Sequence, residues 1–414
     1  MAYCSLILID QNFFLTDSVS RLVSALLSIV FRPLNRSCGV GSTFRAVWRT
    51  VLTAVALVAL SRTAAAQPGQ TGLSGYMDFH FTKQQAADGQ LDFHRFVLLI
   101  THQFSDRIRF VSEVELEHAF VEGLERSGEV ELEQAYVDFL LSRRFNVRAG
   151  MLLAPIGILN ERHEPPVYYG VERPLLETVI IPTTWFEAGA GIHGELGRGW
   201  RYRAYVMSPL NALEFSAEEG LRNGRQKGGQ TNIGRPAATG RVEYVGIRGL
   251  TAGGSFWTGH SGFAFRPRFE VPVRLLEADV RYARRRFEGR AEVAHVQISN
   301  AGLLNDAIFR TSGINPNVAQ TLRGSYLEGS YRIVSGAKAG DVGLFVRYEN
   351  VDTQARMPAG YVPLKAFDRD AWVVGGTYWP DPDIAIKFDY THQRNQSAVT
   401  PAPHTFGVGL GWWF

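Results

Sequence analysis

Residues 145–196 read FNVRAGMLLAPIGILNERHEPPVYYGVERPLLETVIIPTTWFEAGAGIHGEL, and this stretch decides the fold. Apolar and polar residues alternate over residues 145–151 and again over residues 185–193, and a period of two is typical of strands with one apolar face. Residues 154–183 lie between them and carry five prolines, too many for an internal strand or helix. The stretch therefore predicts two strands joined by a long loop.

The loop at residues 154–183 has an apolar content that favours order. A connection of about 30 residues without regular structure is usually functional or disordered. Ile156, Ile158, Tyr168 and Tyr169 are apolar or aromatic and need a surface to pack against. We therefore expect this loop to be a functional segment that folds against the rest of the protein.

Residues 45–66 have the features of a secretory signal peptide. Arg45 and Arg49 precede an apolar run at residues 51–60, and three alanines at residues 64–66 follow. The run is too short to cross a bilayer, which needs about 20 residues. We expect cleavage after Ala66, which leaves residues 67–414 as one domain, and we interpret residues 1–44 as an extension upstream of the native start.

Cleavage changes what the composition implies. The whole chain has a net charge of +3 and two cysteines, Cys4 and Cys38. Both cysteines, six arginines and two aspartates lie before residue 67, so the remainder has no cysteine and a net charge of −1. This composition excludes a disulfide framework and gives no basic footprint for nucleic acid.

Segments of alternating polarity repeat from residue 72 to the C-terminus. The last four cover residues 342–350, 371–379, 384–391 and 405–414. Alternating segments of roughly ten residues are the signature of a transmembrane β-barrel. We predict an all-β, antiparallel, up-and-down barrel of about 16 strands, located in the bacterial outer membrane and in contact with its lipid.

The connections between these segments alternate in length. Residues 105–106, 142–143 and 248–249 are short connections, whereas residues 154–183 and 208–238 are long ones. Outer-membrane barrels have short periplasmic turns and long external loops. Residues 154–183 form the third long connection, which we call the third loop. A soluble periplasmic β protein, the other class considered, has no reason to sort its connections in this way.

Several stretches resemble outer-membrane porins of the phosphate-selective porin O and P type. They are residues 92–98 (DFHRFVL), 107–118 (RIRFVSEVELEH), 155–161 (PIGILNE), 163–166 (HEPP) and the terminal Phe414. The resemblance implies a passive channel with a third loop folded into the lumen, no enzymatic activity and no cofactor. It also implies a homotrimer and recognition of Phe414 by the outer-membrane assembly machinery.

One feature of that family is missing. Phosphate-selective members line their pores with arginine and lysine, which pair with desolvated phosphate. Here only five lysines follow residue 66, and the third loop has a net charge of −2. We therefore expect this protein to share the channel function of the family but not its phosphate selectivity. We expect the third loop to favour cations weakly.

Two groups of residues are predicted to face solute. The pore constriction is expected to consist of the polar residues of the third loop, namely Asn160, Glu161, Arg162, His163, Glu164, Glu172 and Arg173. The lumen wall is expected to carry both signs of charge, from Arg109, Glu113, Glu115, Glu117, Arg148, Arg201, Arg203, Arg347 and Glu349. Such charges either orient solutes in a transverse field or neutralise one another and brace the wall, and the sequence leaves both readings open.

Sites of other kinds are less well supported. Strand spacing places His118 on the opposite face from Glu113, Glu115 and Glu117, so we predict no metal site there. Residues 189–194 match GxGxxG but lie in a predicted strand, whereas a nucleotide fingerprint opens a helix. His163 and Glu164 are interpreted as a solvated salt bridge. The leading hypothesis is a diffusion channel for small hydrophilic solutes or ions, and the alternative is a plugged barrel that acts as an enzyme or adhesin.

Overall fold

The computed structural model describes residues 69–118, 128–264 and 269–414. The predicted extension at residues 1–44 and signal peptide at residues 45–66 lie outside these ranges. No helix in the described ranges is both long and apolar enough to cross a membrane.

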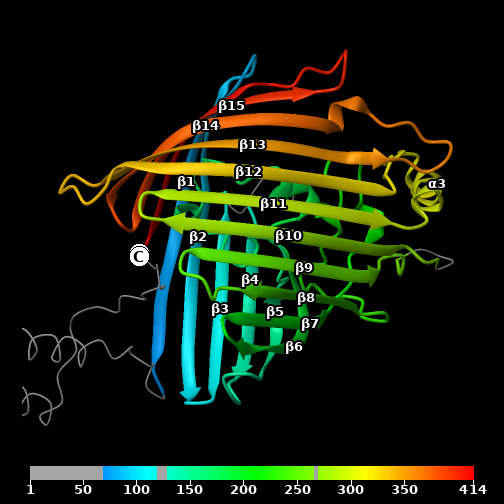
Figure 1. Ribbon diagram of the computed structural model, residues 1–414. Coiled ribbons are helices and arrows are strands. Elements are labelled where there is room, and N and C mark those ends of the chain that lie inside the picture. The colour runs from blue at the N-terminus through cyan, green and yellow to red at the C-terminus, as the bar shows by residue number, and fades with distance from the viewer. Residues whose placement is uncertain (1–68, 119–127, 265–268) are drawn as a thin grey trace, which may run out of the picture. The chain divides into compact units, whose positions relative to one another are not determined.

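Sixteen strands form one closed antiparallel sheet, which confirms the predicted fold class (Figure 1). Each strand pairs with its neighbours in the sequence, and β1 closes the ring by pairing with β16. The strands are β1 (Thr71–Gln84), β2 (Gly89–Ser105), β3 (Ile108–Glu117), β4 (Val130–Phe139), β5 (Asn146–Leu153), β6 (Phe186–Gly197), β7 (Trp200–Met207), β8 (Ala237–Tyr244), β9 (Leu250–His260), β10 (Pro272–Arg284), β11 (Phe287–Ile298), β12 (Thr321–Val334), β13 (Asp341–Arg356), β14 (Asp368–Asp381), β15 (Ile384–Asn395) and β16 (Thr405–Trp413).

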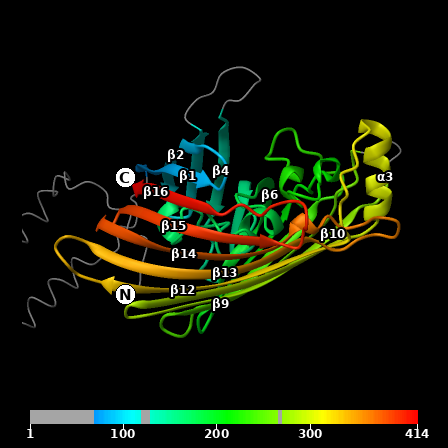
Figure 2. The same cartoon turned by 90° about the horizontal axis from the view of Figure 1, so that it is seen from above.

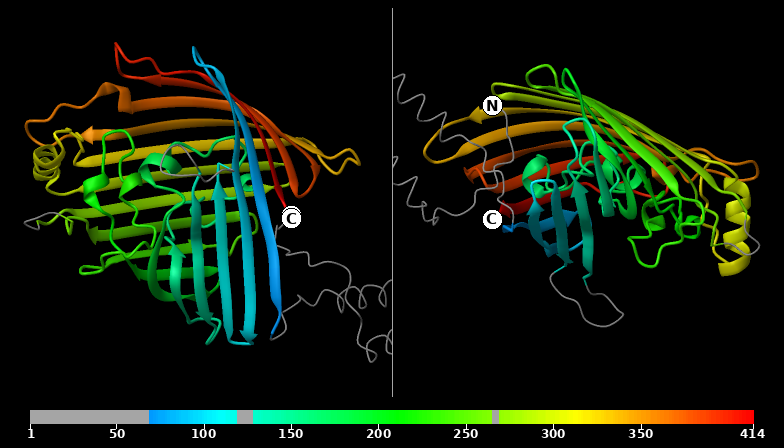
Figure 3. Two further views of the ribbon diagram at one scale, coloured as in Figure 1. Left: turned by 180° about the vertical axis from the view of Figure 1, so that it is seen from behind. Right: turned by 90° about the horizontal axis from the view of Figure 1, so that it is seen from below.

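The strands expose apolar side chains on the outside of the barrel and bury charged ones on the inside. In β10, Leu276 and Val280 are 62% and 40% exposed, whereas Glu277 and Asp279 are each 6% exposed. A soluble core has the opposite arrangement, and a lipid-facing outer surface requires this one. Figures 2 and 3 show the same ring of strands from above, behind and below.

The connections keep the predicted alternation with one difference. Turns at residues 106–107, 198–199, 285–286 and 382–383 are two residues long, whereas residues 154–185, 208–236 and 299–320 form long loops. The first external connection is only residues 85–88, because β1 and β2 stay paired as far as Lys83 and Gly89. Helix α3 (Ala301–Ser312) lies in the loop between β11 and β12, at the opposite end of the sheet from the β12–β13 turn (Figure 1).

The third loop crosses the inside of the ring. It contains a short helix η1 (Pro165–Val167) and a helical turn η2 (Leu176–Ile180). The first contacts β1, β15 and β16, and the second contacts β11, β12 and β13. A single loop therefore packs on two separate sections of the wall.

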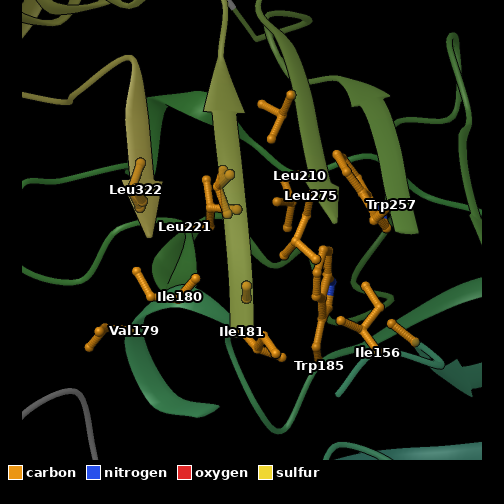
Figure 4. Packing of buried hydrophobic residues seen from close by; sticks show 14 of the residues in the cluster. Ile156, Val179, Ile180, Ile181, Trp185, Leu210, Leu221, Trp257, Leu275 and Leu322 are labelled. Carbon is orange, nitrogen blue, oxygen red and sulfur yellow. The ribbon is translucent and has the colours of Figure 1, made fainter. Parts of the chain in front are cut away.

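An apolar core fills part of the interior. Ile156, Ile180, Ile181 and Trp185 of the third loop are fully buried. Figure 4 shows them packed against side chains of other segments, namely Leu210 and Leu221 from the loop before β8 and Trp257, Leu275 and Leu322 from the wall. The sequence predicted a lumen lined by residues that face solute, but burial of each such apolar side chain stabilises the fold by about 1.5–3 kcal/mol, which favours a packed core.

Gly150 provides a test of the strand pairing between β4 and β5. Its φ is +136°, and an added Cβ would lie 2.2 Å from the Ala135 carbonyl oxygen and 2.8 Å from Tyr136 Cα. We expect Gly150→Ala to lower the free energy of unfolding by about 1–3 kcal/mol, because the backbone must shift. Urea unfolding of the folded barrel in detergent, followed by heat-modifiable gel migration, measures the change.

Gly254→Ala is the matched control. Gly254 lies in β9, and its added Cβ would meet only the Glu277 carbonyl oxygen at 3.5 Å, an ordinary contact. Equal unfolding midpoints for the two variants would contradict the proposed close approach at Gly150.

Candidate functional site

Charged side chains of the wall hold the backbone of the third loop. The pairs are Arg290 Nη2 to Val167 O at 2.7 Å, Lys387 Nζ to Gly170 O at 2.9 Å, Val171 N to Asp389 Oδ2 at 2.6 Å, Leu175 N to Glu349 Oε2 at 2.5 Å and Ile158 N to Glu292 Oε1 at 3.2 Å. A buried loop lacks the ladder partners of a strand, so other groups must satisfy its N–H and C=O groups. Charged residues of β11, β13 and β15 provide these hydrogen-bond partners.

Arg347 and Glu349, both predicted to face solute, belong to the wall charges that bind the backbone of the third loop. Each is 2% exposed. Arg347 Nε donates to Glu349 Oε1 at 2.6 Å, and Arg347 Nη1 donates to Glu328 Oε2 at 3.2 Å. Their prediction as solute-facing residues is therefore wrong, because the third loop covers them.

Asn160 closes the neck of the third loop and does not face solute as predicted. It is fully buried. Its Nδ2 donates to Ala154 O at 2.7 Å and to Trp185 O at 2.9 Å, and its Oδ1 accepts from Trp185 N at 2.6 Å. Ala154 O and Trp185 O also accept from Ile156 N and Ala154 N, at 2.8 and 2.9 Å, so Asn160 is the essential partner of Trp185 N.

His163 is also buried, which corrects the interpretation of a solvated pair with Glu164. It is 2% exposed, and its Nε2 lies 2.9 Å from Glu133 Oε2 and 3.6 Å from Glu113 Oε1. Burial disfavours the charged imidazole, but the carboxylates of Glu133 and Glu113 outweigh it and raise the pKa of His163. Glu113 and Glu115 are 2% and 4% exposed, so these two wall residues do not face open water either.

Glu177 is a loop carboxyl group whose role the sequence did not reveal. It is fully buried and accepts from Ile158 N at 2.9 Å, Leu159 N at 2.7 Å and Thr183 Oγ1 at 3.0 Å. Burial raises its pKa above the ordinary value. The loop therefore folds around a carboxyl group that keeps its proton to a higher pH than a solvated carboxyl group does.

The open part of the interior lies beside β5 to β10. A cavity of about 420 Å³ is lined by Arg143, Asn146, His193, Gly194, Glu195, Arg201, Tyr202 and Arg203. A second, much narrower cavity of about 10 Å³ is lined by Gly157, Ile158, Glu161, Arg162, Arg203, Arg241, Glu243 and Arg281. Both are lined by Arg203, so the two cavities lie next to each other.

The predicted site residues divide between these environments. Glu161, Arg162 and Arg203 meet at the narrow cavity, where Arg203 Nε lies 3.1 Å from Glu161 Oε1, and Arg201 lines the wide one. The others are placed as follows: Arg109 and Arg148 bind Asp138, Glu172 lies 3.1 Å from His80, Arg173 donates to His163 O, and Glu117 and Glu164 are partly buried.

Several residues of this network were not predicted from the sequence. Asp138 accepts from Arg109 at 2.8 Å and Arg148 at 2.7 Å, and it lies 3.2 Å from His193. Its position between outward-facing residues of β4 was the available signal. Arg222 donates to Thr183 O at 2.6 Å from another loop, and nothing in the local sequence indicates this contact.

A cluster of Asp92, His94 and His118 contains the histidine that was predicted to form no metal site with Glu113, Glu115 and Glu117. Strand β3 ends at Glu117, and His118 has a φ of +55°, so strand spacing no longer applies. His118 Nδ1 lies 3.0 Å and His94 Nδ1 lies 3.1 Å from Asp92 Oδ2. These three side chains could bind a metal ion, but Arg95 Nη2 lies 2.7 Å from His94 Nε2 and places a positive charge against the cluster.

Comparisons with known proteins agree with the fold. No family model matches the chain. An uncharacterized protein of Aquifex aeolicus is 35% identical over 331 residues, which cover 78% of this chain and 75% of that protein. Among solved structures, the outer-membrane channel DcaP of Acinetobacter baumannii has a TM-score of 0.55 at 11% identity over 85% of this chain and 99% of that one.

Two further structures are similar at the level of the fold. The anion-selective porin from Comamonas acidovorans has a TM-score of 0.53 at 11% identity, over 84% of this chain and all of that one. The trimer form of OmpT from Vibrio cholerae has a TM-score of 0.51 at 11% identity, with the same coverage. At this identity the likeness shows a porin-like barrel, and the narrower resemblance to phosphate-selective porins stays a prediction.

Removal of the Asn160 side chain should loosen the neck of the third loop. Asn160→Ala leaves the buried Trp185 N–H without its acceptor, which costs about 1–3 kcal/mol, whereas Ala154 O and Trp185 O keep backbone donors. We expect the Trp185 amide to exchange with deuterium at least about tenfold faster. Thr178→Ala, which removes one bond of 3.3 Å to Pro174 O, is the control. Unchanged exchange at Trp185 would contradict the role of Asn160.

Glu177 should make the stability of the barrel depend on pH. Its folded-state pKa is raised, so its contribution is full below the unfolded pKa of about 4.3 and is lost as pH rises through the folded pKa. The thermal midpoint of the folded barrel should fall as pH rises above about 4.3, and Glu177→Gln should reduce this slope. Glu164→Gln, a partly buried carboxylate of the same loop, is the control. Parallel slopes for wild type and Glu177→Gln would show that another group dominates.

Proposed function

Because this chain belongs to the same family as the Aquifex aeolicus protein and folds as a porin-like barrel, we propose that it is an outer-membrane channel for small hydrophilic solutes or ions. The proposal includes passive diffusion without enzymatic catalysis. Its support is the outward apolar surface, which suits lipid, together with a polar cavity of about 420 Å³ beside β5, β6 and β7.

The observation that carries the proposal is the arginine lining of the narrow cavity. Four arginines and two glutamates line it: Arg162, Arg203, Arg241 and Arg281 with Glu161 and Glu243. Arg241 and Arg281 are paired, with Arg281 Nη2 at 2.8 Å from Glu243 Oε1, whereas Arg162 is exposed and has no ion pair within the described part of the chain. Arg203 pairs with Glu161, and Arg241 pairs with Glu277 and Asp279, so Arg162 supplies the uncompensated positive charge of this lining, and such a charge beside a passage favours anions.

This proposal replaces the weak cation preference expected from the loop charge. That expectation counted every carboxylate of the third loop as free to meet solute. Glu177 is fully buried, Glu161 lies 3.1 Å from Arg203, and Glu172 lies 3.1 Å from His80. The negative charge of the loop is therefore mostly compensated by its partners before it reaches the passage.

A plugged barrel remains the second candidate, because one observation favours it. The apolar core occupies part of the interior, and the narrow cavity of about 10 Å³ has room for about one water molecule. Such a barrel would act through its external loops as an enzyme or adhesin. Conductance separates this candidate from a channel.

The assembly is proposed to be a homotrimer in the outer membrane, as the trimer form of a structural neighbour suggests. Phe414 is proposed as the contact for the assembly machinery. It is 53% exposed and lies at the seam of the barrel, where Phe414 N donates to Gly75 O and Gly75 N donates to Phe414 O, both at 3.0 Å.

Single-channel recording tests the proposal. In planar bilayers with a KCl gradient, the protein should give stepwise, ohmic openings and a reversal potential on the anion side. Arg162→Gln combined with Arg203→Gln should lower the chloride-to-potassium permeability ratio by about twofold or more, because two positive charges leave the passage.

Arg107→Gln is the matched control, since Arg107 is an exposed arginine in the turn between β2 and β3. It should leave the permeability ratio unchanged. A folded barrel that stays silent would refute the channel and favour the plugged barrel. Equal permeability ratios for the double variant and the wild type would refute the arginine-lined passage.

A further inference from the structure

Three side chains from three segments meet between the third loop and the wall. They are Glu113 of β3, Glu133 of β4 and His163 of the third loop, and the side chains are 2–3% exposed. His163 Nε2 lies 2.9 Å from Glu133 Oε2 and 3.6 Å from Glu113 Oε1, and one ligand atom from each residue lies within 4.8 Å of the other two. An imidazole and two carboxylates are thus directed at one point.

These separations suit a single small cation. Zinc binds imidazole nitrogen and carboxylate oxygen at about 2.0–2.2 Å. At that radius, the separations of 2.9 and 3.6 Å correspond to ligand–metal–ligand angles of about 90° and about 125°. Both angles lie within about 20° of the tetrahedral value, so an ion fits once the side chains shift to open the smaller angle.

The groups around the three ligands orient them for binding. His163 Nδ1 lies 3.3 Å from the Asn160 carbonyl oxygen, which leaves Nε2 directed at the carboxylates. Tyr76 Oη donates to Glu113 Oε1 at 3.1 Å, and Gln134 Nε2 donates to Glu113 Oε2 at 2.5 Å. A metal-binding histidine almost always donates its other ring N–H to a carbonyl or carboxylate, and ligating carboxylates are themselves hydrogen-bonded.

A β-bulge brings Glu133 into the cluster. Glu113 pairs with Gln134 and Val114 pairs with Leu132, so Glu133 is an extra residue in β4. Bulges redirect a side chain and are common beside functional sites. The irregularity explains why two successive residues of β4, Glu133 and Gln134, both reach the cluster.

The cluster also has too little positive charge. Glu115 lies beside Glu133 and is 4% exposed, and its Oε1 accepts no hydrogen bond. The fixed cation is Arg95, whose Nη1 lies 3.3 Å from Glu115 Oε1 and whose Nε lies 3.9 Å from Asp78 Oδ2. Burial of Glu113, Glu115 and Glu133 beside one another, with Arg95 and His163 as their cationic partners, is unfavourable, and a bound divalent cation compensates such charge.

We propose that Glu113, Glu133 and His163 bind a divalent transition-metal ion, with zinc as the best match, and that the ion fastens the third loop to β3 and β4. The ion enters before the loop docks, because the site is buried afterwards. The proposal is independent of which solute the barrel conducts.

The experiment measures metal binding by the full-length folded barrel. The protein is refolded in detergent with zinc chloride, dialysed, and analysed for bound zinc by atomic emission. The wild type should retain about one zinc per chain. His163→Gln and Glu133→Gln should each lose most of it, and cobalt in place of zinc should give the intense visible absorption of a tetrahedral site only in the wild type.

His118→Gln is the matched control, because His118 belongs to the other cluster of histidine and carboxylate groups. It should retain zinc at the wild-type level. If His118→Gln loses the metal and His163→Gln retains it, the ion binds at Asp92, His94 and His118 and the proposal is overturned. A wild-type barrel that retains no zinc and shows no cobalt spectrum would also overturn the proposal.

A second measurement separates metal loss from misfolding. Heat-modifiable gel migration identifies the folded fraction of each variant, and Glu113→Gln replaces any variant that does not fold. Chelation of the wild type should accelerate proteolytic cleavage within the third loop several-fold, whereas chelation of Glu133→Gln should have no further effect. Equal acceleration in both proteins would refute the role of the ion in fastening the loop.

Discussion

The hydrogen bonds between wall charges and the backbone of the third loop are the interaction on which the rest of this structure depends. A loop that runs through the inside of a barrel has no strand partner and little water to satisfy its N–H and C=O groups. Arg290, Lys387, Asp389 and Glu349 supply these partners from the wall. Without them the loop would carry unpaired buried groups, each costing about 1–3 kcal/mol.

The same bonds determine which wall charges the third loop covers. A charged side chain that binds loop backbone is covered by that loop and is lost to the lumen, as Arg347 and Glu349 show with 2% exposure each. The wall beside β5 to β10 is less covered, and its arginines line both cavities. Basic and acidic residues are about equally frequent after residue 66, whereas arginines outnumber glutamates in the lining of the small cavity.

Local irregularities of the strands concentrate polar side chains at particular points. The bulge in β4 adds Glu133 beside Glu113, and the left-handed backbone of His118 turns that side chain toward Asp92. In a regular strand, successive side chains alternate between lipid and lumen, so neighbouring residues cannot serve one site. Both clusters of histidine and carboxylate groups in the described chain lie at such an irregularity.

The sequence by itself determined the barrel, its approximate strand number and the position of its longest ordered loop. Each of these follows from local patterns, because a strand between lipid and lumen alternates with a period of two and a proline-rich segment cannot join the sheet. Alternation also identified Arg203 as a wall residue, and it lines both cavities. Only the tertiary structure decided which polar residues face water. Asn160, His163 and Arg347 are as polar as Arg162 and Arg203, but the first three are buried by contacts with residues far away in the chain. The physical reason is that polarity is a property of one residue, whereas burial depends on which distant segment packs over it.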